Sequence, residues 1–126
     1  MTSQSILVDT CIFVEFFRGK KDENLEFLIV NNQVLLSQIV YLEILRGVRK
    51  AEYKFINKTL QYLKLLPQFA DSKVSRELLI KLKGKGLSLG IPDLLIIADS
   101  LTNKASLYTN DTELLAAAKI AGVAVL

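Results

Sequence analysis

The stretch ILVDTCIFVEFF, residues 6–17, sets one carboxylate, Asp9, between two apolar runs. Short runs rich in Ile, Leu and Val are typical of strands that are buried on both faces. An ionised carboxylate that is taken out of water costs several kcal/mol unless it has a partner, a cation or an opening to solvent. We therefore expect a buried strand over 5–9 whose last residue has a chemical role.

Similar aliphatic runs recur along the chain and alternate with helical patterns. Strands are predicted at 34–37, 106–109 and 123–126 as well as at 5–9, with a weaker one at 63–67. Helices are predicted over 22–32, 38–50, 55–63, 71–86, 92–103 and 110–122, where Asn110 caps the last helix with Glu113 as its capping-box partner. The alternation predicts an α/β fold with a mostly parallel central sheet of 4–5 strands and helices on both faces.

Length and composition indicate one domain over 1–126. The chain has 126 residues, 51% of them hydrophobic, which suffices for one buried core. No apolar run approaches the ~18–20 residues that a membrane-spanning helix needs, so no membrane association is expected. The start, MTSQS, lacks a signal-peptide pattern, and one cysteine cannot form an internal disulfide, so a cytoplasmic location is expected.

The absence of histidine restricts the chemistry. Imidazole is the commonest general base near neutral pH and a leading zinc ligand, and the sequence has no His and one Cys. Catalysis by Ser-His or Cys-His pairs within this chain is therefore excluded. A metal site must use oxygen ligands, which suit Mg²⁺, Mn²⁺ or Ca²⁺.

Positive charge is concentrated in residues 46–85. This segment holds eleven Lys and Arg against three acids, whereas the rest of the chain holds five against ten. Such an asymmetry suits a polyanion that lies across one surface. The candidate nucleic-acid surface consists of Arg46, Arg49, Lys50, Lys83 and Lys85. The alternative is that these residues are the solvated faces of helices.

Four isolated acids occur near the predicted carboxyl ends of strands or at helix starts: Asp9, Glu43, Asp93 and Asp111. Because a parallel sheet forms its binding crevice at the carboxyl ends of its strands, these side chains could converge. Asp93 and Asp111 could equally be ordinary first-turn acids of helices, whereas Asp9 and Glu43 are not expected at helix starts. Converging carboxylates favour a divalent cation, which can activate water for phosphodiester cleavage.

Four blocks of sequence together resemble the PIN-domain ribonucleases, and specifically the VapC toxins of type II toxin-antitoxin pairs. They are VDTCIFVEFFRG (8–19), YLEILRGV (41–48), IPDLLIIADS (91–100) and YTNDTEL (108–114). The resemblance implies a single PIN-like domain and an endoribonuclease that depends on Mg²⁺ or Mn²⁺. It implies that Asp9, Glu43, Asp93 and Asp111 are the catalytic and metal-binding residues and that Thr10 and Thr109 support them.

The resemblance also implies partners. Proteins of this kind cleave an RNA substrate, are commonly homodimers and are inhibited by a small VapB-like antitoxin whose C-terminal segment blocks the site. Asp99 departs from the family pattern, in which a Thr or another small residue is usual. It lies about 120° around the helix from Asp93, so we expect it to be peripheral to the site. Of Asn110 and Asp111, we expect Asp111 to approach the metal.

Two other functions remain open at this point. One is a catalytically inactive PIN-like module that binds RNA or a partner, against which the presence of all four acids argues. The other is a phosphate-switch receiver domain, but VLLS (34–37) is not followed by the phosphoacceptor Asp that such a domain needs. Two further residues have structural interpretations: Cys11 as a small buried hydrophobic residue, and Glu15 with Arg18 as a surface pair one helical turn apart.

Overall fold

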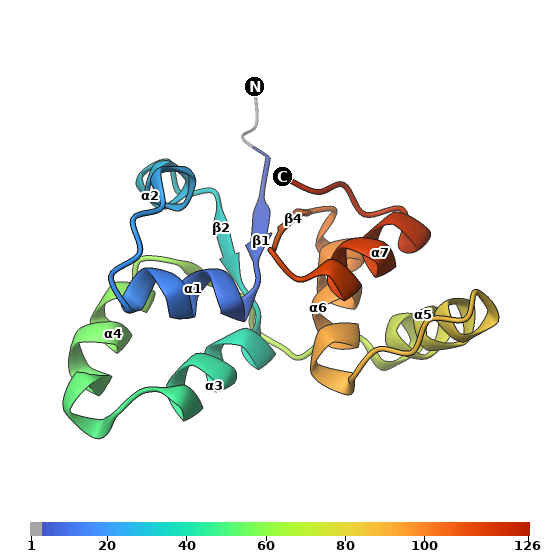
Figure 1. Ribbon diagram of the computed structural model, residues 1–126, viewed down its shortest axis with the longest axis horizontal. Coiled ribbons are helices and arrows are strands. Elements are labelled where there is room, and N and C mark those ends of the chain that lie inside the picture. Colours follow the sequence, from blue (N-terminus) through green and yellow to red (C-terminus); the bar gives the residue numbers. More distant parts are fainter. Residues whose placement is uncertain (1–3) are drawn as a thin grey trace.

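Four short strands form one parallel sheet in the computed structural model, which describes residues 4–126 (Figure 1). They are β1 (Ile6–Val8), β2 (Val34–Leu36), β3 (Lys64–Leu65) and β4 (Ser106–Tyr108), in the order β3-β2-β1-β4. All three strand pairs are parallel, so their carboxyl ends lie at the same edge of the sheet. The predicted α/β fold with a parallel central sheet is confirmed.

Seven α-helices and one 3₁₀ turn surround the sheet within the described residues. They are α1 (Thr10–Phe17), α2 (Glu23–Val30), α3 (Gln38–Gly47), the 3₁₀ turn η1 (Lys50–Glu52), α4 (Tyr53–Leu60), α5 (Ser72–Gly84), α6 (Ile91–Asn103) and α7 (Thr112–Ala121). In Figure 1 they form two groups, with α1 to α4 on one side of β1 and α5 to α7 on the other.

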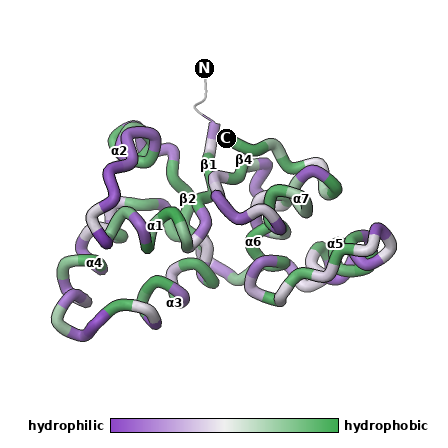
Figure 2. The backbone as a smooth tube through the Cα atoms, viewed as in Figure 1, coloured by the Kyte–Doolittle hydropathy of each residue, from purple (hydrophilic) through white to green (hydrophobic). Residues whose placement is uncertain are grey.

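The central strands are buried along their whole length. Leu7 and Val8 of β1 have no exposed surface, and all three residues of β2 are buried. This explains why their sequences are continuous aliphatic runs instead of alternating apolar and polar residues. Figure 2 shows that the surrounding helices, in contrast, mix hydrophobic and hydrophilic residues, as expected for helices with one face on a core.

Two predicted elements differ from the structure. Residues 123–126 do not form a strand: the backbone N–H of Leu107 donates to Ala124 and that of Leu126 to Leu107, which makes a single bridge at Val125. The helix predicted over 38–50 ends at Gly47, and residues 50–52 form the 3₁₀ turn. Within residues 4–126, no helix has both the length and the apolar character needed to cross a bilayer.

Candidate active site

Asp9 lies at the point where β1 ends and α1 begins, and its side chain is only 5% exposed. Its Oδ1 accepts a hydrogen bond from the Thr10 backbone N–H at 2.7 Å. Its Oδ2 accepts from the Thr109 hydroxyl at 2.7 Å and from the Cys11 thiol at 3.1 Å. These three donors compensate the burial of the carboxylate.

The expectation that Asp9 does not sit at a helix start is wrong. Asp9 is the N-cap of α1, with the extended backbone (φ −72°, ψ 155°) that N-cap residues adopt. The helix begins directly at Thr10 because the strand and the helix share this residue as their boundary. Asp9 therefore combines a structural role as a cap with a position at the carboxyl edge of the sheet.

Two threonines connect Asp9 to other acids. The Thr10 hydroxyl donates to Glu43 Oε1 at 2.7 Å, which joins α1 to the half-buried acid of α3. The Thr109 hydroxyl accepts from the Asp111 backbone N–H at 3.0 Å while it donates to Asp9. One hydrogen-bonded chain thus runs from the Glu43 carboxylate through Thr10, Asp9 and Thr109 to the backbone N–H of Asp111.

Asp111, and not Asn110, is the N-cap of α7. Its Oδ1 accepts from the backbone N–H groups of Glu113 at 2.8 Å and Leu114 at 3.2 Å. Asn110 is exposed, so the prediction that it caps the helix is wrong. The physical reason is that both residues are good caps by type, and the backbone conformation of Asp111 (φ −78°, ψ 120°) decides between them.

Asp93 lies in the first turn of α6, two residues after the helix begins, and is half-buried. Burial, followed by the negative charges of Asp9, Asp111, Glu43 and Glu113, raises the pKa of Asp93 to about 6. A charge influences a neighbouring pKa in this way only across a short distance. Asp93 therefore lies within electrostatic range of the three other predicted acids, and we refer to these four residues as the acid cluster.

The acid cluster has the ligand chemistry of a hard cation, since all its donors are carboxylate oxygens. In the hydrogen bonds formed by residues 4–126, Glu43 and Asp111 each use one carboxylate oxygen, which leaves the other oxygen available. Among these same residues, no group of three His, Cys, Asp or Glu side chains already has the arrangement of a metal site.

Cys11 is half-buried and touches the acid cluster, so describing it only as a small hydrophobic residue is incomplete. Burial is the main cause that raises the pKa of its thiol, and the neighbouring Asp9 charge adds to it. A raised thiol pKa disfavours the nucleophilic thiolate. The contact of Cys11 with Asp9 has no signal in the sequence, because it depends on the side-chain directions in the first turn of α1.

The candidate basic residues all lie on the surface, three beyond Glu43 in the chain and two at the end of α5: Arg46, Arg49, Lys50, Lys83 and Lys85. Arg49 is engaged by an ion pair, because its Nε donates to Glu52 Oε1 at 2.6 Å. Figure 1 shows α3 and α5 on opposite sides of β1, so the two groups flank the central part of the sheet.

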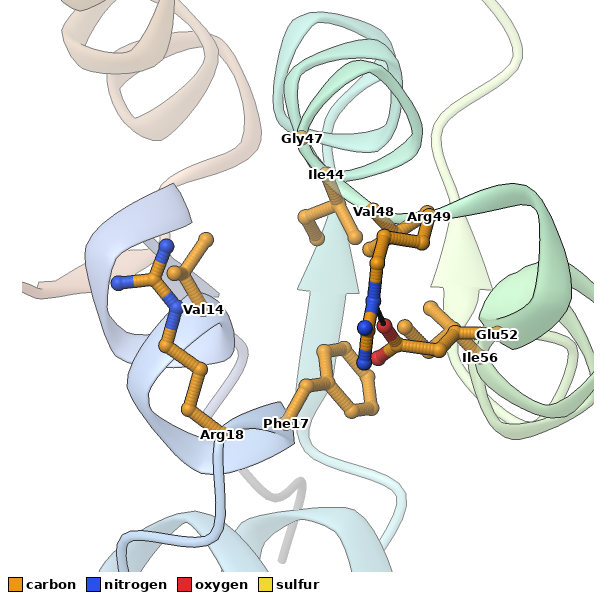
Figure 3. Close-up of a pocket in the computed structure, with 9 residues that line it drawn as sticks. All are labelled: Val14, Phe17, Arg18, Ile44, Gly47, Val48, Arg49, Glu52 and Ile56. Carbon is orange, nitrogen blue, oxygen red and sulfur yellow. Dashed lines mark hydrogen bonds and ion pairs between the residues drawn. The ribbon is translucent and has the colours of Figure 1, made fainter.

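A pocket of about 560 Å³ lies between α1, α3, η1 and α4 (Figure 3). Its lining is mostly apolar and consists of Val14, Phe17, Arg18, Ile44, Gly47, Val48, Arg49, Glu52 and Ile56. The expected pair of Glu15 with Arg18 does not form: Glu15 pairs with Lys20 at 3.0 Å, and Arg18 lines the pocket. Sequence reasoning missed this pocket, whose signal is the set of apolar residues on three separate helices.

Comparison with known proteins identifies relatives of this chain. The family model of the PIN domain matches residues 6–120. Ribonuclease VapC2 from Rickettsia felis is 33% identical over 114 residues, which cover 83% of this chain and 85% of the relative. A solved structure of VapBC2 from the same organism, bound to a promoter DNA fragment, contains a chain with 27% identity and a TM-score of 0.76, with 96% of both chains covered. DNA-bound VapBC from Salmonella typhimurium has the same fold, with a TM-score of 0.79 at 19% identity over 98% of both chains.

Proposed function

Because the chain belongs to the PIN-domain family, we propose that it is a VapC-like toxin, an endoribonuclease that cleaves RNA phosphodiester bonds with a divalent cation. The observation that carries the proposal is the acid cluster. Thr10 joins Asp9 to Glu43, Thr109 joins Asp9 to the backbone N–H of Asp111, and the charges of these acids add to the raised pKa of Asp93. Similarity to ribonuclease VapC2 supports RNA as the substrate.

We propose that Asp9, Glu43, Asp93 and Asp111 hold Mg²⁺ or Mn²⁺. The residues fit such an ion because every donor is a carboxylate oxygen. Burial is the main cause of the raised pKa of Asp93, and a cation would relieve the repulsion from the other acids that adds to it. Mg²⁺ commonly keeps several waters and needs only one or two direct carboxylates. When bound, the cation supplies an activated water and stabilises negative charge on the phosphate.

The chain's own residues supply positioning. Asp9 is held on both carboxylate oxygens, so it presents a fixed charge at the carboxyl edge of the sheet. Thr10 orients Glu43, and Thr109 links Asp9 to the start of α7. Preorganised carboxylates of this kind lose little motional freedom when they bind a cation and substrate.

We propose that Arg46, Arg49, Lys50, Lys83 and Lys85 contact the RNA backbone. Their exposed positions on both sides of the sheet would let a polyanion lie across the acid cluster. Phosphate contacts release counterions, so the affinity for RNA should fall as the salt concentration rises. Arg49 contributes only if its ion pair with Glu52 opens, because the two side chains are already in contact.

The test is RNA cleavage by the purified protein with Mg²⁺ or Mn²⁺. Asp9→Asn removes one charge from the acid cluster without changing side-chain size and should abolish cleavage. Glu77→Gln, an exposed position on α5, is the matched control and should cleave like the unaltered protein. Equal cleavage by the Asp9→Asn protein would show that the activity comes from elsewhere. RNA binding without cleavage by the unaltered protein would favour an inactive RNA-binding module.

We also propose a VapB-like antitoxin and a second copy of this chain as partners. Relatives of this chain have been crystallised as VapBC complexes. The pocket in Figure 3 has the apolar lining and the Arg side chains that would suit an apolar segment with acidic neighbours. A small protein encoded beside this gene should copurify with the chain and inhibit cleavage, and sedimentation should give twice the mass of one chain. Copurification without inhibition would contradict the antitoxin proposal.

A further inference from the structure

Asp99 is a buried acid that the proposed reaction does not use. It lies on α6 with 4% of its surface exposed and lines a second pocket, of about 240 Å³, between α6 and the segment that leads into α5. Burial raises the pKa of Asp99 to about 6, and the charges of the acid cluster do not contribute. Asp99 is therefore peripheral to the acid cluster, as expected, but it is not on the surface. The side chain itself is in the interior.

The carboxylate of Asp99 has no compensating partner. Among residues 4–126 no hydrogen bond or ion pair engages its side-chain oxygens, and the Asn103 amide donates instead to the Asp99 backbone oxygen at 2.8 Å. A buried carboxylate without donors is costly when ionised, whereas Asp9 in the same protein has three donors. Ser100 Oγ is the one fully enclosed side-chain polar atom of residues 4–126 that lacks a hydrogen-bond partner, so the Asp99 oxygens are not sealed off and a ligand in the pocket can reach them.

The other residues of this pocket determine which ligand fits. A second acid, Asp71, is exposed and uses Oδ1 to cap α5. The remaining lining combines polar and apolar side chains: Leu66, Pro67, Gln68, Phe69, Thr102 and Asn103. With two acids only, the pocket falls short of the several anionic oxygens that usually bind a divalent metal. Its apolar walls suit the methylene stem of a long cationic side chain, and a cation can also lie over the ring of Phe69.

We propose that the Asp99 pocket receives a lysine or arginine side chain from a partner protein. An exposed apolar side chain in the pocket lining favours a protein over a small solute, because Phe69 is 54% exposed and a small cation would leave it uncovered. Asp99 and Asp71 form a local acidic site on a chain whose net charge is +3. Such a site complements a basic side chain. This inference does not depend on the proposed ribonuclease activity.

The experiment uses n-butylguanidinium as a probe of the arginine side chain and n-butylurea as its uncharged analogue. Backbone amide NMR spectra of the ¹⁵N-labelled protein at pH 7.5 should show saturable shifts in residues 66–71 and 99–103 with the guanidinium but not with the urea. Asp99→Asn should abolish the saturable shifts while the rest of the spectrum stays unchanged. Shifts that do not saturate, or that persist in the Asp99→Asn protein, would overturn the proposal.

The unaltered protein alone keeps the proposal testable if Asp99→Asn does not fold, because equal shifts with the guanidinium and the urea would overturn it. A second variant tests the role of Phe69. Phe69 is exposed, so the Phe69→Ala protein should fold. If the cation lies over the Phe69 ring, loss of the ring should lower the affinity for n-butylguanidinium about two- to fivefold. An unchanged affinity in that variant would overturn the role given to Phe69. Sedimentation then identifies the occupant. Self-association that is lost in Asp99→Asn indicates that the partner is a second copy of this chain.

Discussion

Replacing Thr109 with valine should destabilise the protein by about 2–4 kcal/mol. The hydroxyl is buried, with 7% of the residue exposed, and it donates to Asp9 Oδ2 at 2.7 Å while it accepts from the Asp111 N–H at 3.0 Å. A hydrogen bond to a charged group contributes about 1.5–3 kcal/mol, and a neutral one about 0.5–1.5 kcal/mol. Valine has nearly the same shape, so the loss comes from two polar groups that are left without their partner.

Urea unfolding, followed by far-ultraviolet circular dichroism, measures this difference, since the sequence contains no tryptophan. Thr109→Ser is the matched control, because it keeps the hydroxyl and removes one methyl group, at a cost of about 1 kcal/mol. If Thr109 also positions the acid cluster, the valine protein should bind Mn²⁺ more weakly than the serine protein. A valine variant as stable as the serine variant would refute the reasoning, because packing would then outweigh the hydrogen bonds.

Three further predictions follow from the acids. Asp99→Asn should change how the free energy of unfolding depends on pH. The pKa of Asp99 is about 6 in the folded protein and 3.8 ordinarily, so the unaltered protein should lose up to about 3 kcal/mol of stability as the pH rises from about 4 to 7. The Asn protein should not show this loss. Unfolding curves at several pH values check this, and parallel curves would contradict it. Asp93→Asn should raise the stability of the metal-free protein at pH 7, where the ionised carboxylate is unfavourable, while it abolishes RNA cleavage. Chelation of divalent ions should stop cleavage and leave the circular dichroism spectrum unchanged, whereas loss of helix signal would mean that the cation holds the fold together.

The central strands could be predicted because the physics that buries them also shapes their sequence. Strands covered on both faces need aliphatic residues at every position, and 6–8 and 34–36 show this directly. The edge strand β3 gave a weaker signal because both its residues are exposed. Residues 123–126 have the same aliphatic pattern but make only one bridge, because composition reports burial and β-propensity and says nothing of the number of backbone pairs.

The candidate site could be predicted in its residue types but not in its hydrogen bonds. Isolated acids near strand ends pointed to the acid cluster, since parallel strands deliver their carboxyl ends to one edge. The start of α1 could not be predicted from the sequence, because TCIFVEFF (10–17) is as rich in apolar and β-branched residues as a strand. The choice of Asp111 over Asn110 as a cap depends on one pair of backbone angles, which residue type does not determine.

The positions of the acids explain how like charges gather without a cation to hold them. Asp9 and Asp111 cap α1 and α7, and Asp93 lies in the first turn of α6, so three helix N-termini point toward the acid cluster. A helix N-terminus carries a partial positive charge and unpaired N–H groups, each of which stabilises a nearby carboxylate. Glu43 lies within α3 and receives the Thr10 hydroxyl instead. The backbone therefore offsets much of the repulsion at Asp9 and Asp111, and Asp93, which has the raised pKa, is the acid with the most to gain from a bound cation.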